Sequence, residues 1–327
     1  LDCAKHVSRR AKREREKKMK LVFMGTPEFA VPSLKTLVDS EHEVVGVVTV
    51  PDKPAGRGQK LRPSAVKLAA LEGGLPVLQP EKLKDERFVA ELSSWGADLF
   101  VVVAFRILPE IVFDMPPQGA INLHASLLPK YRGAAPINWA LIHGEKESGV
   151  TTFYIEKRVD TGEILLQKSV SVPENMTAGE LHDQLARLGA EVVLQTVNGI
   201  AANRLKPQKQ VGEITLAPKL TKELEKIDWR QSVQELHNLV RGLSPFPASS
   251  AKFRGKLIKI LRTVKSATND HDVTPGSIVG FSKNGPIDVQ TGDGVLSILR
   301  VKPEGKKAMS AGDFMRGAHL EIGERFE

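Results

Sequence analysis

The 327-residue chain has little of what several classes of protein require. Its single cysteine, Cys3, excludes a disulfide framework and a cysteine-rich zinc site, and it is typical of a reducing compartment. The longest apolar stretch, Leu99 to Phe105, is far shorter than the roughly 18 residues that a membrane-spanning helix needs. The charged first residues are followed by no apolar segment of a secretory signal. We therefore expect a cytoplasmic protein that does not contact a membrane.

Several motifs are also missing. The turn Gly25-Thr26-Pro27 follows an apolar run but lacks the GxGxxG spacing of a dinucleotide site, so it predicts only a tight strand-to-helix turn. No HExxH motif or Cys/His cluster indicates a metal site, and we expect no metal. No serine or cysteine lies in a nucleophile elbow such as GxSxG. A reaction in which the substrate's own amine attacks would explain that last absence.

The net charge of +8 is unevenly distributed. Residues 1–20 carry nine Lys and Arg against three Asp and Glu, and residues 206–327 carry 20 against 14. Residues 21–205 are mildly acidic, with 18 basic and 22 acidic residues. An acidic domain beside a basic one indicates a polyanionic partner. Residues 1–18 have almost no apolar periodicity, so we expect a disordered basic arm and assign it no function.

Short apolar runs alternate with helical patterns over residues 19–204. Strands are expected at 21–24, 43–50, 76–78, 98–104, 120–123, 150–154 and 164–172, and helices at 30–40, 64–72, 86–95 and 178–200. Thr177 and Glu180 have the spacing of a capping box at the start of the last helix. This alternation predicts an α/β domain with a doubly wound, Rossmann-like, mostly parallel sheet.

The pattern changes after residue 204. Residues 205–222 are polar and aperiodic, as in a linker, and residues 223–327 form a second predicted domain. In that domain a helix is expected at 232–243, followed by short β-type runs at 250–253, 256–265, 276–281, 287–290 and 294–302. Gly-rich turns separate these runs at hairpin spacing, so we predict a small OB-like antiparallel barrel.

The strongest local motif for chemistry is Asn122-Leu123-His124. Residues two apart on a strand face the same side, so the amide and the imidazole would project together at the carboxyl end of a sheet strand. Such a pair suits acyl transfer, in which the amide stabilises an oxyanion and the histidine moves a proton. A structural histidine is the alternative. The other histidines, among them His42, His143, His182, His237 and His319, lie in polar contexts and are expected mostly at the surface.

Two further segments have open interpretations. Asp160 lies in a turn before Gly162, where it either caps that turn or orients and charges His124. The Pro- and Gly-rich loop 51–63 carries Lys53, Arg57, Lys60 and Arg62 against a single carboxylate, Asp52. It is either a solvated loop or one that binds phosphates.

Residues 19–327 resemble the methionyl-tRNA formyltransferases, a family of 10-formyltetrahydrofolate-dependent enzymes. The segments that carry the likeness are VFMGTPEFA, PDKPAGRGQKLRPSAVK, INLHASLLPKYRGAAPINWALI, GVTTFYIEKRVDTGEIL, APKLTKELEKIDW and VRGLSPFPAS. The Asn–His–Asp set and SLLP are common to formyltransferases that use this folate. The PDKPAGRG loop and the second domain narrow the acceptor to initiator methionyl-tRNA.

The resemblance implies a role for each matching residue. Asn122, His124 and Asp160 would be catalytic in a direct attack of the methionyl amine on the formyl carbon. Ser126, Leu127, Leu128 and Pro129 match the folate-binding stretch, and Arg57 matches a tRNA-contacting arginine, so Lys53, Lys60 and Arg62 beside it are expected to bind tRNA as well. The co-substrate would be 10-formyltetrahydrofolate, and the protein would act as a monomer.

One departure affects the expected folate site: Phe105-Arg106 stands where the family often has Tyr-Gly.

Three other functions compete with that of a methionyl-tRNA formyltransferase. A formyltransferase for a small amine would have no need of the basic second domain. An RNA-binding module with a vestigial catalytic fold would have no reason to retain Asn122, His124 and Asp160 together. A nicotinamide oxidoreductase would need the missing glycine fingerprint.

Overall fold

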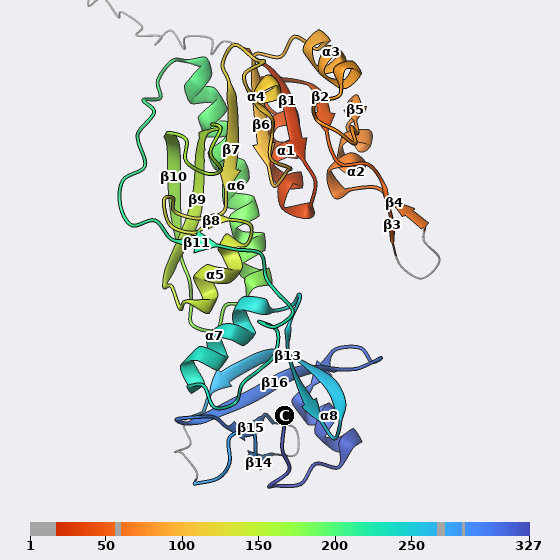
Figure 1. The fold of residues 1–327 in the computed structure, drawn as a ribbon, viewed down its shortest axis with the longest axis vertical. Helices are drawn as coiled ribbons and strands as arrows, with labels where there is room; N and C mark the ends of the chain where they lie inside the picture. Colours follow the sequence, from red (N-terminus) through yellow and green to blue (C-terminus); the bar gives the residue numbers. More distant parts are fainter. Residues whose placement is uncertain (1–17, 56–59, 267–271, 283–284) are drawn as a thin grey trace, which may run out of the picture.

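A computed structural model describes residues 18–55, 60–266, 272–282 and 285–327 (Figure 1). Nearly all of the expected N-terminal arm and Arg57 of the basic loop lie outside the described residues. The first group of elements, in chain order, comprises β1 (Lys20–Gly25), the 3-10 helix η1 (Glu28–Ala30), α1 (Val31–Val38), β2 (Glu43–Val48), β3 (Lys53–Ala55), β4 (Lys60–Arg62), α2 (Ala65–Glu72), β5 (Val77–Leu78), α3 (Glu86–Ser94), β6 (Leu99–Val103), α4 (Glu110–Phe113), β7 (Ala120–His124), β8 (Arg132–Gly133), α5 (Pro136–Ile142), β9 (Glu147–Tyr154), β10 (Ile164–Ser171) and α6 (Ala178–Ala201).

Seven of these strands form one sheet, in the order β10-β9-β7-β6-β1-β2-β5. The five strands from β7 to β5 are parallel, and β9 and β10 are antiparallel at one edge. All five residues of β6 are buried, because a parallel strand is covered on both faces. The mostly parallel sheet that the sequence predicts is therefore confirmed.

The two faces of the sheet are covered by different helices. Leu21 and Phe23 of β1 belong to a core that includes residues of α1, α2 and α6. Val22 and Met24, which alternate with them, pack in a second core with residues of α3 and α4. The long helix α6 begins at the capping box expected from the sequence. The Glu180 N–H donates to the Thr177 hydroxyl, and the Thr177 N–H donates to the Glu180 carboxylate.

The strands from β12 onward form a second sheet. The remaining elements of the chain are β11 (Leu216–Ala217), α7 (Val233–Leu243), β12 (Ser249–Phe253), β13 (Lys256–Lys265), β14 (Ile278–Phe281), β15 (Ile287–Gln290), β16 (Val295–Pro303), β17 (Met309–Ser310) and α8 (Ala311–Ala318). Strands β12-β13-β16-β15-β14 pair antiparallel in this order, and β17 pairs with β16. The C-terminal residues connect the two edge strands of this sheet, through the bridge Phe253–Phe326 at β12 and the bridge Ser277–Arg325 next to β14. This closes the small barrel that the sequence predicts.

Helix α7 lies between the two sheets (Figure 1). It contributes Leu236 and Val240 to the core of the barrel, and it packs against α5 on the other side. Across this contact the Asn138 side chain donates a hydrogen bond of 2.7 Å to the carbonyl of Gly242. The second sheet is thus connected directly to α5, which borders the site described below. The domain bounds at 204/205 and 222/223 stay a prediction.

The structure differs from the sequence-based expectation in three places. The basic loop 51–63 contains a hairpin of β3 and β4, because Lys53–Ala55 and Lys60–Arg62 pair antiparallel. Part of the expected linker forms β11, which pairs with β8. Helices α4, α5 and α8 lie in segments for which no helix was predicted. No helix in the described part of the chain is long and apolar enough to cross a membrane.

Candidate active site

Asn122, His124 and Asp160 line one cavity of about 830 Å³. Asn122 and His124 share a face of β7, whereas Ile121 and Leu123, which alternate with them, belong to the core on the other side. Asp160 comes from the turn after β9, and its Oδ2 lies 3.9 Å from Nδ1 of His124. The structure therefore brings together the three residues that the sequence placed in two distant segments.

The ring of His124 is held by the backbone. Its Nε2 lies 2.8 Å from the carbonyl oxygen of Tyr131. A carbonyl oxygen can only accept, so Nε2 carries the proton and Nδ1 is the nitrogen left to exchange one. A separation of 3.9 Å between Nδ1 and the carboxylate of Asp160 is that of an ion pair rather than a hydrogen bond.

Asp160 faces away from its own turn. Its backbone has φ of 55°, in the left-handed region that aspartate tolerates better than most residues. Its Oδ2 accepts a hydrogen bond of 2.9 Å from the backbone N–H of Gly133. A Cβ on the nearby Gly162 would lie 1.7 Å from the carbonyl oxygen of Tyr154, so only glycine fits there. The Asp160 carboxylate therefore lies beside His124 and Gly133, and its role toward His124 stays a prediction.

The connecting segment that follows α6 holds this turn in place, which the sequence analysis missed. Nε2 of Gln210 donates to the carbonyls of Asp160 and Gly162, both at 2.9 Å. Oε1 of Gln210 accepts from Nε and Nη2 of Arg132, at 3.2 and 2.6 Å. A polar, aperiodic segment gives no sequence signal for such contacts. The expected linker is thus part of the support of the site.

The backbone that holds His124 is itself paired with the same segment. The N–H of Tyr131 donates to the Thr215 hydroxyl at 2.8 Å, and β11 pairs with β8. Gly133 of β8 has φ of 126°, and a Cβ there would lie 2.6 Å from the carbonyl oxygen of Ala217. Tyr131 and Gly133, which contact His124 and Asp160, are therefore both fixed by residues 215–217.

The cavity has two walls. One consists of the irregular segments 104–108 and 155–160, and the other consists of residues of η1, α5, α6 and the segment after β11: Pro27, Phe29, Ile137, Asn138, His182 and Lys219. Four cations line the cavity against two carboxylates, namely Arg106, Lys157, Arg158 and Lys219 against Glu156 and Asp160. A cationic cavity within an acidic segment of the chain suits an anionic ligand.

Arg106, at the position that departs from the usual family pattern, builds part of the first wall. Its Nη1 and Nη2 donate to the carbonyls of Glu81 and Pro80, at 3.0 and 2.8 Å. Its guanidinium lies over the Phe105 ring, 5.2 Å from the centroid. Burial lowers the pKa of Arg106, but the side chain keeps its place through these carbonyls. Arg106 thus ties the cavity wall to the segment before α3.

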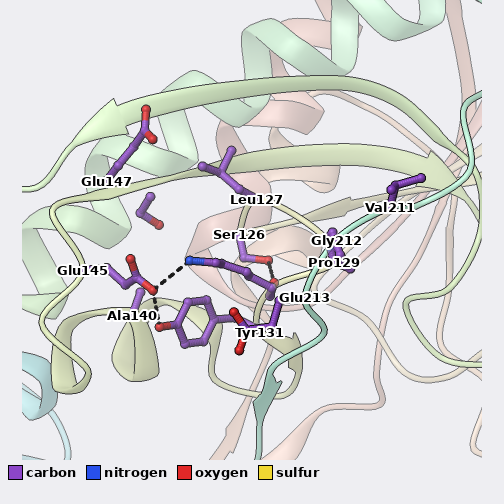
Figure 2. A pocket seen from close by; sticks show the side chains of 12 residues that line it. Ser126, Leu127, Pro129, Tyr131, Ala140, Glu145, Glu147, Val211, Gly212 and Glu213 are labelled. Carbon is purple, nitrogen blue, oxygen red and sulfur yellow. Dashed lines mark hydrogen bonds and ion pairs between the residues drawn. The ribbon is translucent and has the colours of Figure 1, made fainter.

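Ser126, Leu127, Leu128 and Pro129 do not line this cavity. Ser126, Leu127 and Pro129 line a second one of about 330 Å³, together with acidic residues of β9 and the connecting segment (Figure 2). The Tyr131 hydroxyl points at Glu145 there and donates at 2.8 Å, and burial together with this carboxylate raises the pKa of Tyr131. The Ser126 hydroxyl donates to the carbonyl of Lys130 at 2.6 Å and so closes the loop after β7. A folate contact of these four residues stays a prediction.

Of the residues predicted to bind tRNA, Lys53, Lys60 and Arg62 lie on the β3–β4 hairpin, which projects from the first group of elements (Figure 1). Lys53 and Arg62 are opposite each other in the β3–β4 register and are both exposed, and Lys60 opposes Ala55. Asp52, the one carboxylate of the loop, binds Lys67 at 2.7 Å. Hydrogen bonds from Lys67 and Gln79 lower the pKa of Asp52. Because α2 supplies its partner, Asp52 does not neutralise the hairpin.

Two histidines differ from the expected surface position. His42 and His237 are buried, with exposed fractions of 6% and 1%. His42 is hydrogen-bonded to Asn198, and His237 lies between Thr263 and the carbonyl of Glu174. Tertiary partners that sequence context does not reveal explain both. Within the residues that the structure describes, no group of three or more His, Cys, Asp or Glu is arranged to hold a metal ion.

The sequence matches two family profiles. Residues 19–197 match the profile described as formyl transferase, and residues 219–319 match the formyl transferase C-terminal domain. A methionyl-tRNA formyltransferase of Bacteroides fragilis is 46% identical over 312 residues, which is 92% of this chain and 96% of the relative. One from Clostridium perfringens is 47% identical over 309 residues, or 94% of this chain and 99% of the relative.

Solved structures with low identity share the fold. HypX from Aquifex aeolicus, in complex with tetrahydrofolic acid, has a TM-score of 0.65 and 17% identity, covering 94% of this chain and 48% of that one. The sugar 3N-formyltransferase WlaRD has a TM-score of 0.64 and 21% identity, covering 88% and 99%. The fold, the matched profiles and the identity over nearly the whole length lead to one conclusion: the chain belongs to the methionyl-tRNA formyltransferase family.

Proposed function

We propose that the protein transfers the formyl group of 10-formyltetrahydrofolate to the α-amino group of methionyl initiator tRNA. The observation that carries this proposal is the convergence of Asn122, His124 and Asp160 on one open cavity, with 3.9 Å between the imidazole and the carboxylate. An amide donor, a proton-transfer group and a charge partner are what acyl transfer to an amine requires.

The reaction begins with a neutral methionyl amine. Its nitrogen attacks the formyl carbon and forms the new C–N bond, which turns the carbonyl oxygen into an oxyanion. The Asn122 side-chain N–H donates to this oxyanion, and one such donor contributes about 3 to 4 kcal/mol. Nδ1 of His124 takes the proton that the amine loses, and Asp160 stabilises the imidazolium.

Collapse of the tetrahedral intermediate completes the transfer. The bond between the formyl carbon and N10 of the folate breaks, and N10 receives the proton from Nδ1 of His124. The products are formylmethionyl-tRNA and tetrahydrofolate. Throughout, the Tyr131 carbonyl holds Nε2–H, so the ring does not turn when its charge changes. Neither a metal nor a covalent enzyme intermediate is needed.

The two walls of the cavity suggest where each substrate lies. The irregular wall of segments 104–108 and 155–160 offers backbone groups to the flat ring of the folate. Lys219 of the other wall follows β11 in the segment that leads to the second sheet, and we propose that the aminoacyl end enters beside it. Ser126, Leu127, Leu128 and Pro129 would then act on folate binding indirectly, because they follow His124 and fix the loop whose Tyr131 carbonyl holds its ring.

Affinity for tRNA would come from charge outside the cavity. We assign phosphate contacts to Lys53, Arg57, Lys60 and Arg62 of the hairpin segment and to the basic second domain. Basic groups that bind phosphates release counterions, so this part of the affinity should fall steeply with salt. We further propose that the protein works as a cytoplasmic monomer, in the compartment where translation starts.

One incubation tests the proposal. The protein is mixed with 10-formyltetrahydrofolate and charged initiator tRNA, and parallel reactions contain uncharged tRNA, free methionine or a small amine such as glycinamide ribonucleotide. Formylation of the charged tRNA alone is the expected result. Formylation of the small amine at a similar rate would contradict the assignment of the acceptor. Binding of tRNA without formylation would contradict the enzymatic function.

A further inference from the structure

Phe246 is the only aromatic side chain that is strongly exposed. The 12 phenylalanines, three tryptophans and two tyrosines of the chain all lie among the described residues. All of them are buried or half-buried except Phe246, whose exposed fraction is 81%. An aromatic ring left in water forgoes a large gain in burial energy, so its position requires an explanation.

The backbone that carries Phe246 is firmly held. Prolines 245 and 247 restrict φ on both sides of it. Ser244 and Ala248 are buried, the Ser244 hydroxyl donates to the carbonyl of Leu261 at 2.7 Å, and the Ala248 N–H donates to the carbonyl of Leu243 at 2.9 Å. The ring is therefore presented on a fixed segment, which keeps the entropy cost of binding to it low.

This segment lies next to the catalytic cavity. The N–H of Gly179, in the first turn of α6, donates to the carbonyl of Ser244 at 3.0 Å. A Cβ on Gly179 would lie 2.7 Å from Cδ of Pro245, so the two segments are in direct contact. His182, three residues further along α6 and about 4.5 Å along its axis, lines the catalytic cavity.

Two cations of β13 accompany the ring. Nζ of Lys259 donates to the carbonyl of Pro247, and Arg262 pairs with Glu180 of α6 at 3.0 Å. Lys259 also lies 3.8 Å from Glu225. These ion pairs are partly exposed, so their carboxylates can be replaced by phosphates at modest cost. An exposed aromatic beside such cations is the combination that binds single-stranded nucleic acid.

We propose that Phe246 stacks against an unpaired base at the acceptor end of the tRNA. The inference rests on the proposed function, because it takes an aminoacylated tRNA as the substrate. The methionyl group can reach Nδ1 of His124 only if the single-stranded acceptor end passes the rim of the cavity. A rigid aromatic at that rim would guide the end, and it would read no particular base, because every base has a stacking face.

The first test compares Phe246→Ala with Phe246→Trp. Loss of the ring should raise the Kd for charged tRNA about 10- to 100-fold, whereas tryptophan should restore affinity. The KM for 10-formyltetrahydrofolate and the melting temperature should not change. Ile322→Ala, at another exposed apolar residue of the second domain (68% exposed), is the matched control and should bind as the wild type does. Equal affinity of Phe246→Ala and wild type, or equal loss in the alanine and tryptophan variants, would overturn the proposal.

The second test identifies the base. Charged tRNAs with an abasic nucleotide at each unpaired acceptor position in turn are bound to wild type and to Phe246→Ala. One position should weaken binding to the wild type but leave the variant unaffected, because the stacking partner is already lost. If every abasic tRNA weakens both proteins equally, the ring does not stack on this end and is left as a surface for another protein. Affinity is read without catalysis, so a wild type that fails to formylate would refute the proposed function without deciding this test.

Discussion

The catalytic cavity and the β3–β4 hairpin are both proposed to contact the tRNA substrate, but they are built in opposite ways. Around His124 and Asp160, the ring Nε2–H, the carboxylate and the turn backbone have fixed partners: the Tyr131 carbonyl, the Gly133 N–H and the Gln210 amide, respectively. Lys53 and Arg62 of the hairpin are exposed and belong to two paired strands of three residues each. The comparison teaches that proton transfer depends on position, whereas attraction of a polyanion depends on charge.

The largest effect is expected from His124→Ala. Without the group that moves the proton, kcat should fall about 10²- to 10⁴-fold. The affinity for tRNA should stay within a factor of about two, because the basic surfaces are untouched. Single-turnover formylation and filter binding measure the two quantities. If His124→Ala lowered the tRNA affinity as much as the turnover, the cavity and the hairpin could not have the separate roles proposed for them.

A smaller loss of turnover is expected from Gln210→Ala. This change removes two hydrogen bonds to the Asp160 turn and one partner of Arg132 without touching the cavity wall. A shift of the carboxylate should lower kcat about 10- to 100-fold at little cost in KM. Gln208→Ala, an exposed residue of the same segment whose backbone alone pairs with Ile164, is the control. Equal kcat values for the two variants would show that the segment does not position Asp160.

Substitutions in the hairpin should weaken tRNA binding without changing turnover. Lys53→Ala combined with Arg62→Ala should raise KM for tRNA about fivefold and reduce the salt slope of the affinity by about two. The kcat and the KM for the folate should be unchanged, because neither Lys53 nor Arg62 lines the cavity that contains His124. Lys84→Ala, an exposed lysine of the same domain, serves as the control. A fall in kcat would mean that the hairpin also shapes the cavity.

The smallest effect concerns pH and stability at the junction of the two sheets. Burial lowers the pKa of His237 from its ordinary value of 6.5, although the nearby carbonyl of Glu174 acts in the opposite direction. Below pH 6.5 the unfolded chain therefore binds a proton at His237 that the folded chain does not bind. The free energy of unfolding decreases as the pH falls from 6.5 toward the lower pKa of the folded state. The difference in unfolding free energy between wild type and His237→Gln should be larger at pH 8 than at pH 5.5 in urea titrations. An equal difference at both values would contradict this.

Regular elements could be read from the sequence because local pattern determines them. The buried strand at Leu99–Val103 and the capping box at Thr177 are examples, and alternation on β7 put Asn122 and His124 on one face. The distance from His124 to Asp160 could not be derived, because it depends on how two segments 36 residues apart meet. The hydrogen bonds of Gln210 and the burial of His237 had no local signal either. The short hairpin strands were hidden among Pro, Gly and Lys, which disfavour strands in general.

The central claim is that Asp160 acts through His124. A double-mutant cycle of His124→Ala and Asp160→Asn, followed by single-turnover formylation at saturating charged tRNA and folate, tests it most directly. The account predicts that the double variant is no slower than His124→Ala within about threefold, because the carboxylate has no imidazolium left to stabilise. Losses that multiply in the double variant would contradict the account, since Asp160 would then act on the reaction independently.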